Sequence, residues 1–331
     1  MKKSTPAIAL VLASLSAFSG AACAQSSVTV YGIVDAGISR EDNGGPKGSV
    51  TSLDSGVQSG SRLGFKGSED LGGGLKANFV LEMGLNADTG TSAQGGRAFG
   101  RQSFVGLAGD FGTVNLGRQK SVTYDIMDDL DPFNIGLAGD AGRLFNTTNR
   151  NNNAVTYFTP NLSGFIGSLQ YAFGEVAGNT AASRVIGASG SYSAGPLLAS
   201  LAYEKVNDAT GNDAAKKTLL GATYNFGVAK AHATYEINKG TGALDTRVWL
   251  VGVSVPVGLG AILADYTRVT DQANANANAN QIAIGYTYNL SKRTNLYTSF
   301  SRTSNDSAVA YNAGANGATD KLFNAGIRHK F

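Results

Sequence analysis

Most of the chain alternates apolar and polar residues with a period of two. Between Gln281 and Asn289, four large apolar or aromatic residues occupy every second position, and smaller or polar residues fill the positions between them. The same alternation runs through residues 75–84, 197–203 and 220–226. Because successive side chains of a β-strand point to opposite faces, this period predicts strands that each bury one face.

The predicted strands are joined by connections that alternate strictly between short and long. The short connections are at residues 70–74, 109–112, 160–164, 194–196, the break around Gly227, 256–260 and 289–293. The long, polar ones are at residues 40–59, 87–96, 121–153, 176–182, 207–214, 239–243, 272–279 and 305–319. Seven short and eight long connections predict sixteen strands with both termini on the short-loop side. Short turns on one side and long loops on the other are typical of transmembrane β-barrels of the outer membrane.

Alternation alone does not separate such a barrel from a soluble sandwich. In a sandwich the apolar faces point at each other, whereas in a wide barrel they point outward because side chains cannot fill the lumen. The glycines and small polar residues on the alternate faces favour a water-filled interior. The fold class that we expect is therefore all-β, a transmembrane antiparallel barrel, with a soluble secreted β-sandwich carrying binding loops as an alternative.

One long segment, residues 121–153, lacks the two-residue alternation. It is longer than ordinary connections, and such loops in compact architectures are usually functional. We expect it to fold into the barrel and narrow the lumen. It carries five acidic residues: Asp125, Asp128, Asp129, Asp131 and Asp140.

The first residues have the composition of a secretory signal peptide. Lys2 and Lys3 precede an apolar run and the small-residue site Ala22-Cys23-Ala24, so residues 1–24 are expected to be removed and residues 25–331 to form the barrel. A lipoprotein anchor at Cys23 is the alternative. Removal leaves 25 basic and 24 acidic residues, a formal charge of +1, and no cysteine. Nearly neutral charge argues against nucleic-acid binding, and the lack of cysteine leaves no thiol metal site or disulfide.

Candidate basic residues follow from strand parity. Leu63 and Phe65 form the apolar face of their strand, which turns Arg62 and Lys66 toward the lumen. Arg101 and Arg150 lie on the strands before and after the 121–153 segment. Rings of charge at a constriction are how pores tune ion preference. The alternative, compatible with the first, is that these arginines pair with the loop acids and hold the loop in place.

The residues offer little for catalysis. The chain has two histidines, His232 and His329, and no mature thiol, so Ser-His or Cys-His dyads and zinc sites have few parts. We expect His232 to be a satisfied or solvated side chain near an external loop. No catalytic residue, metal or cofactor is predicted. A substrate-specific channel remains an alternative, and an outer-membrane barrel enzyme, such as a lipase or protease, is a further one.

Several motifs resemble one known family. They are SSVTVYGIVDAGI near the mature start, SRLGFKGSEDLGGGLKA at residues 61–77, GRQSFVGLAGDFGTVNLGRQ at residues 100–119, NLSKRTNLY at residues 289–297, and GIRHKF at the end. Together they resemble the trimeric, sixteen-stranded general diffusion porins of Gram-negative outer membranes, most closely the beta-proteobacterial branch. The resemblance implies a homotrimer in outer-membrane lipid that passes small hydrophilic solutes and ions by passive diffusion.

The resemblance also implies roles for individual residues. The third external loop would fold inward, with Arg62, Arg101 and Arg150 as the basic wall of the constriction, and trimers would form through the first and last strands. Asp129 and Asp131 are the loop acids most similar to those of the family, although Pro132-Phe133-Asn134 replaces the family's proline-glutamate-phenylalanine-glycine. Arg118 is a candidate for the trimer interface. Convergence of Arg62, Lys66, Arg101 and Arg150 on the lumen predicts a weak anion preference.

Overall fold

The protein is a β-barrel, described here from a computed structural model for residues 27–145 and 149–331. The predicted signal peptide therefore lies outside the described residues. The strands of the first half are β1 (Ser27–Asp42), β2 (Val50–Ser55), β3 (Arg62–Gly72), β4 (Leu75–Asn86), β5 (Thr91–Ser92), β6 (Gln102–Gly109), β7 (Gly112–Lys120), β8 (Arg150–Phe158) and β9 (Phe165–Ala172).

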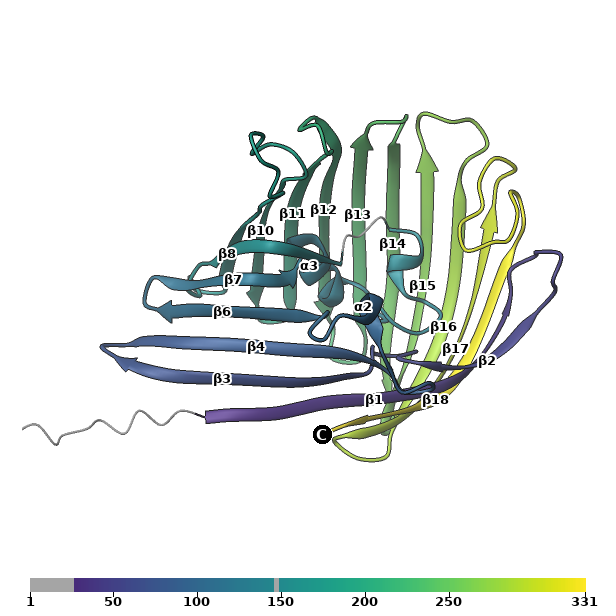
Figure 1. The fold of residues 1–331 in the computed structure, drawn as a ribbon. Coiled ribbons are helices and arrows are strands. Elements are labelled where there is room, and N and C mark those ends of the chain that lie inside the picture. The colour runs from purple at the N-terminus through teal and green to yellow at the C-terminus, as the bar shows by residue number, and fades with distance from the viewer. Residues whose placement is uncertain (1–26, 146–148) are drawn as a thin grey trace, which may run out of the picture.

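The strands of the second half are long and regular (Figure 1). They are β10 (Val185–Ala194), β11 (Leu197–Asn207), β12 (Asp213–Asn225), β13 (Lys230–Gly240), β14 (Asp245–Val257), β15 (Gly260–Asp271), β16 (Ala279–Asn289), β17 (Thr294–Asn305) and β18 (Asp320–Lys330). Three short helical pieces complete the described part: α2 (Ala93–Gly96), α3 (Val122–Leu130) and the 3-10 turn η1 (Ala141–Arg143). None of the helices in the described ranges is long and apolar enough to cross a membrane.

The strands form one closed antiparallel sheet. Each crossing pairs with the next along the chain, and β1 pairs with β18 from Ile33–Lys330 to Asp42–Lys321, which closes the barrel. β2 and β3 both pair with β1 and together make one crossing, and β5 is a two-residue piece of a loop. Among the described residues the sheet therefore crosses sixteen times, as the connections predicted. The seven short turns of the sequence all join neighbouring strands.

The first long connection differs from its prediction. The segment 40–59 was expected to be a loop, but β1 continues to Asp42 and β2 already begins at Val50. A break follows at residues 56–61, where Gly56 has a φ of 73°. The buried Asp35 carboxylate stabilises this break, because it accepts the backbone N–H groups of Gln58 at 2.9 Å and Ser59 at 2.6 Å. Alternating polarity does not reveal a break of this kind inside a strand.

The apolar positions of the strands point outward. Leu201, Leu220, Ile282 and Ile284 are 48–58% exposed, and Phe331 at the C-terminus is 47% exposed. Exposed apolar side chains around a closed barrel form the band that contacts lipid. The alternation therefore predicted the outward face correctly.

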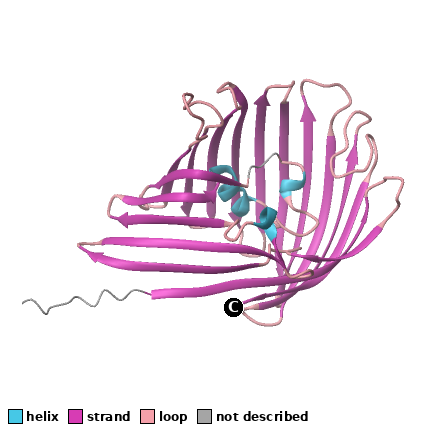
Figure 2. Ribbon diagram, viewed as in Figure 1, coloured by secondary structure: helices cyan, strands magenta, loops and turns pink. Residues whose placement is uncertain are grey.

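The buried apolar core lies inside the barrel. Figures 1 and 2 show the helical pieces gathered within the ring of strands. Ile126, Met127 and Leu130 of α3 pack there against inward-facing wall residues, including Leu219 and Leu250. The glycines and small polar residues of the alternate faces favoured a water-filled interior, but on this side of the barrel the inward residues are apolar and buried. The wall is apolar here because the inserted loop covers it and excludes water.

Candidate functional site

The inserted loop begins with an amphipathic helix. The Ser121 hydroxyl accepts the N–H of Tyr124 at 3.2 Å and caps the start of α3. The apolar residues of α3 face the wall, whereas Asp125 and Asp129 are exposed on its other side. Burial of one stripe fixes which face looks into the remaining opening. The helix packs mainly on β10 and β11, with further contacts to β9, β12 and β13.

Asp131 organises the turn that follows α3. Its side chain is fully buried and accepts three backbone N–H groups, from Phe133 and Ile135 at 2.9 Å and from Ala141 at 3.0 Å. Burial and the nearby Asp140 raise the pKa of Asp131 to about 7. The three N–H donors favour its charged form and lower the pKa, but by less than burial raises it. Asp131 was predicted to be a constriction acid; we correct this, because it has no surface that faces the lumen.

Asp140 has a similar structural role. Its carboxylate accepts the N–H of Gly142 at 2.7 Å and caps η1. Burial is the main cause that raises its pKa, to about 6. The carboxylate is thus engaged by its own backbone turn and, like that of Asp131, supports the fold of the loop.

Further contacts tie the loop to the wall around the barrel. The His232 ring on β13 donates from Nδ1 to the Leu130 carbonyl oxygen at 3.0 Å and accepts from the Ser254 hydroxyl at 3.2 Å. Ala138 N–H donates to the Ser299 hydroxyl at 3.0 Å. His232 is satisfied, as predicted, but it lies near the short turn between β12 and β13 and not near an external loop.

An ion-pair cluster fixes the far end of the loop. Arg143 Nη2 lies 2.6 Å from Asp320 Oδ2 on β18 and 3.5 Å from Glu41 Oε1 on β1. The Asp320 side chain is fully buried. Because the loop is attached to the wall on both sides of the opening, its position is set by the barrel.

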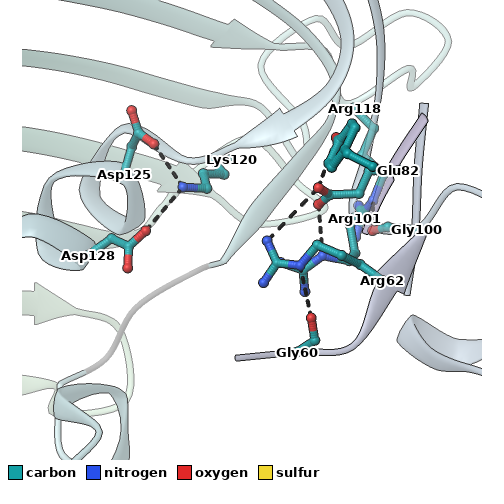
Figure 3. A network of polar contacts seen from close by, with 10 residues as sticks. Gly60, Arg62, Glu82, Gly100, Arg101, Arg118, Lys120, Asp125 and Asp128 are labelled. Carbon is teal, nitrogen blue, oxygen red and sulfur yellow. Dashed lines mark hydrogen bonds and ion pairs between the residues drawn. The ribbon is translucent and has the colours of Figure 1, made fainter. Parts of the chain in front are cut away.

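Opposite the loop, arginines gather around one carboxylate. Figure 3 shows Arg62 from β3 and Arg101, next to the start of β6, converging on Glu82 of β4. Arg101 Nε lies 2.8 Å from Glu82 Oε1, and Arg62 Nη1 lies 3.9 Å from Glu82 Oε2. Tyr31 donates its hydroxyl to the same carboxylate at 3.0 Å. Glu82 is 4% exposed, so these charges are only weakly screened by water.

A lysine joins the basic side to the helix. Lys120 Nζ lies 3.2 Å from Asp125 Oδ1 and 3.4 Å from Asp128 Oδ2 (Figure 3). Lys120 and Arg150 both lie 5.7 Å from the centre of the Tyr124 ring, which is cation–π distance. The structure thus brings Arg150 to the same level as the loop helix. Asp129 makes no ion pair with any basic residue of the described ranges.

Two predicted residues lie outside this cluster. Lys66 shares the inward face of β3 with Arg62, but it lies four residues, about 13 Å, closer to the short turn. It sits 5.3 Å from the Tyr31 ring centre and is exposed. Arg118 donates to the Gly100 carbonyl oxygen at 2.7 Å and to the Asn152 side-chain oxygen at 2.5 Å, and it forms no ion pair with a carboxylate of the described ranges.

Only indirect signals in the sequence pointed to Glu82 and Lys120. Glu82 occupies an inward position of the alternating segment 75–84, which places it in the lumen without indicating its partners. Lys120 directly precedes the loop, at the boundary where the alternation ends. Pairing across strands, which the sequence does not show, joins these residues to Arg101 and α3.

The remaining chemistry of the described part is limited. His232 is engaged by the loop and by Ser254, and His329 Nδ1 lies 2.8 Å from the Thr294 hydroxyl. No group of three histidine, cysteine or acidic residues in the described ranges is arranged to hold a metal ion. The site consists of fixed charges around an opening.

A closed outward-apolar barrel, narrowed by an inward loop with charges on both sides, defines a channel of the outer membrane. The chain belongs to the Gram-negative porin family, whose model matches residues 9–308. It is therefore an outer-membrane porin that forms a water-filled channel for passive diffusion of small hydrophilic solutes. This confirms the fold, the function class and the location that the sequence predicted.

Similar proteins cover the whole chain. Outer membrane porin protein 32 of Delftia acidovorans is 37% identical over 360 residues, and an outer membrane porin protein of Bordetella pertussis is 32% identical over 396, each with full coverage of both chains. The structure of an anion-selective porin from Comamonas acidovorans superposes with a TM-score of 0.81 and 35% identity, covering 92% of this chain and all of that one. These relatives are channels.

Proposed function

We propose that this channel prefers anions and that the cluster of Arg62, Arg101 and Arg150 sets the preference. The observation that carries the proposal is that two guanidinium groups, those of Arg62 and Arg101, share one buried carboxylate, Glu82, while Arg150 lies at the level of the loop helix, 5.7 Å from the Tyr124 ring. The preference of the Comamonas acidovorans protein, similar over most of the chain, supports it.

The degree of burial decides which charges dominate the field. The formal charges are equal in number: Lys120 and the three arginines carry four positive charges, and Glu82 with the exposed acids Asp125, Asp128 and Asp129 carries four negative ones. However, the side chains of Arg62 and Arg101 are only 21% and 9% exposed, whereas those of Asp125 and Asp128 are 53% and 41% exposed. Water and salt screen exposed charges much more strongly than buried ones. The positive wall therefore contributes the stronger field across the opening.

Charge reversal at the wall tests the proposal. Planar-bilayer recordings under a salt gradient give the reversal potential of wild-type protein, Arg62→Glu and Arg101→Glu. We expect both variants to move toward cation preference, and Lys66→Glu, a matched change about 13 Å away, to move much less. Unchanged reversal potentials in the two arginine variants would refute the assignment.

The loop sets the size limit in this proposal, and the protein acts as a channel and not an enzyme. Solutes move down their own gradients, so no group needs to donate or accept a proton. A substrate-specific channel is the second candidate, because Tyr31 and Tyr124 line the cluster. It predicts that one solute blocks the ion current saturably, and titration of candidate anions during the same recordings distinguishes the two.

We further propose a homotrimer in outer-membrane lipid, with contacts through β1, β18 and the adjoining wall. Val28, Val30 and Val34 expose an apolar outward face on β1, which is suitable for burial between subunits. Arg118 is assigned to this interface. Unheated gel electrophoresis and cross-linking test the assembly, and Arg118→Glu is expected to weaken it while the single barrel stays folded.

A further inference from the structure

A recess in the inner wall lies beside the start of the inserted loop. It has a volume of about 190 Å³ and is lined by residues of β6, β7, β8 and β9 together with the first turn of α3. We call it the β6–β9 recess. Its wall residues lie between α3 and the short turns of these strands, and they include Phe158, the last residue of β8. Short turns are periplasmic in such barrels, so the recess is on the periplasmic side of the loop helix.

Two aromatic side chains interrupt the polar inner surface at the recess. Phe104 alternates with the outward Val105 and Leu107, which are 57% and 45% exposed, so its side chain points into the barrel. Phe158 shares the inward parity of the buried Thr156. Both phenylalanines line the recess. The interior of such barrels is usually polar, so the two rings supply an apolar contact face that a channel for ions alone does not need.

Side-chain amides form much of the remaining surface of the recess, and two of them are held in place. Gln170 Nε2 donates to the Lys120 carbonyl oxygen and to the Thr156 hydroxyl, both at 2.9 Å. Gln119 Nε2 donates to two backbone carbonyl oxygens at 3.2 Å. The half-buried Gln102 amide, in contrast, makes no hydrogen bond within the described ranges, so it is free to bind a solute. A wall fixed in this way needs little ordering when a solute enters.

The charged groups of the recess are already matched. Its lining includes one lysine and one acidic residue, Lys120 and Asp125, whose Nζ and Oδ1 atoms lie 3.2 Å apart (Figure 3). A charged solute would bring a further, unpaired charge into this enclosed space, and the burial of an unpaired charge is costly. The recess therefore favours neutral solutes over ions.

Amides beside phenyl rings in a neutral recess match one class of small molecule. We propose that the β6–β9 recess binds a neutral sugar of monosaccharide size during its passage through the channel. Sugar hydroxyls both donate and accept hydrogen bonds, as side-chain amides do, and the apolar face of a sugar ring packs against a phenyl ring. The volume corresponds to roughly six water molecules at about 30 Å³ each, which suits one sugar ring and is smaller than a drug-sized ligand needs.

The position of the recess connects binding to transport. Lys120 and Asp125 belong both to the recess and to the charged opening, so a solute that passes the opening toward the periplasm meets the recess next. A site in a conducting pore must bind weakly enough to release its solute. We therefore expect a dissociation constant on the order of 1 mM. The site takes a neutral solute and uses other residues than the arginine cluster, so it is independent of the ion preference.

Saturation-transfer difference NMR of detergent-purified protein measures binding directly. Glucose is the probe, and benzoate, an aromatic anion without hydroxyl groups, is the comparison. Phe104→Ala and Phe158→Ala each remove one ring of the recess, and Gln102→Leu removes the free amide. Two control variants make the same changes elsewhere: Phe300→Ala on the outward face of β17 and Gln272→Leu in an exposed external loop.

We expect glucose to bind saturably and more tightly than benzoate. Loss of one ring contact or one hydrogen bond should weaken glucose binding about two- to tenfold in each recess variant, and the two control variants should match wild type. In planar bilayers glucose should reduce the ion current of wild-type protein saturably, and Phe104→Ala should need a higher glucose concentration for the same reduction. The reversal potential under a salt gradient should stay unchanged in every recess variant.

Three results would overturn the proposal. They are glucose binding that does not saturate, benzoate binding as tight as that of glucose, and a glucose affinity in Phe104→Ala and Phe158→Ala equal to that in Phe300→Ala. Unheated gel migration shows that each variant is folded. Gln102→Leu changes the size of the side chain little, so it tests the recess if the phenylalanine variants do not fold, and an unchanged glucose affinity in that variant would then refute the site.

Discussion

Neutralising Glu82 is the sharpest test of how the site works. Glu82→Gln keeps a hydrogen-bond acceptor for Arg101 and Tyr31 but removes the buried negative charge that Arg62 and Arg101 share. The arginine cluster then gains one unit of net positive charge. We expect the preference for anions to increase, the opposite of the effect of removing a cation.

The size of the effect follows from the geometry. A unit charge about 5 Å from a passing ion changes its energy by about 0.8 kcal/mol at the dielectric constant of water, and by about four times as much at an effective value near 20. The lower figure changes the partition of each ion about fourfold, in opposite directions for an anion and a cation, so the anion-to-cation permeability ratio changes about sixteenfold. Glu82→Gln should raise the ratio by at least about this factor, and Arg62→Gln should lower it similarly.

Reversal potentials under a salt gradient measure this ratio directly. Lys66→Gln is the matched control, because Lys66 is exposed and about 13 Å from Arg62, beyond the screening length at physiological salt. Unheated gel migration checks that the barrels are folded. The cluster would be shown not to control selectivity if the reversal potential shifted by the same amount in Glu82→Gln and Lys66→Gln. A fall in anion preference in Glu82→Gln would show the same.

Three further predictions concern the inserted loop. Arg143→Gln leaves the buried Asp320 without its cation, which should weaken loop attachment by about 2–3 kcal/mol and increase current noise in single-channel recordings. Leu130→Ala removes a fully buried side chain and should cost about 2–5 kcal/mol of loop packing, seen as faster proteolysis of the loop while the barrel still resists heat in detergent. In the attached loop the pKa of Asp131 is raised from 3.8 to about 7. Between these two pH values the attached loop therefore holds a proton that the detached loop has already lost. Loop attachment should therefore be strongest below about pH 4 and weaken up to about pH 7, with a flatter current-noise profile in Asp131→Asn.

The sequence predicted the barrel because its signals are local. A period of two, seven short turns and eight long connections specify the number of strands and the direction in which their side chains point. Parity also predicted that Arg62 and Lys66 point inward. The residues of the constriction were less predictable, because an inward position does not say which neighbour a charge contacts.

Only the tertiary structure separated the loop acids by role. All five lie in one polar segment, yet Asp131 is fully buried and Asp140 caps a turn, while Asp125 and Asp128 pair with Lys120. The difference comes from the folding of residues 131–145 across the lumen, which no sequence period encodes. The apolar patch under α3 has the same origin.

The sequence by itself determined the architecture, the outward face, and the membrane that such a face requires. Those properties depend on the order of apolar and polar residues along each strand. The tertiary structure decided how Glu82 joins the arginines and how Lys120 reaches Asp125 and Asp128 of the loop helix. These arrangements depend on strand register and on an inserted loop, because both bring together charges that are far apart in the chain.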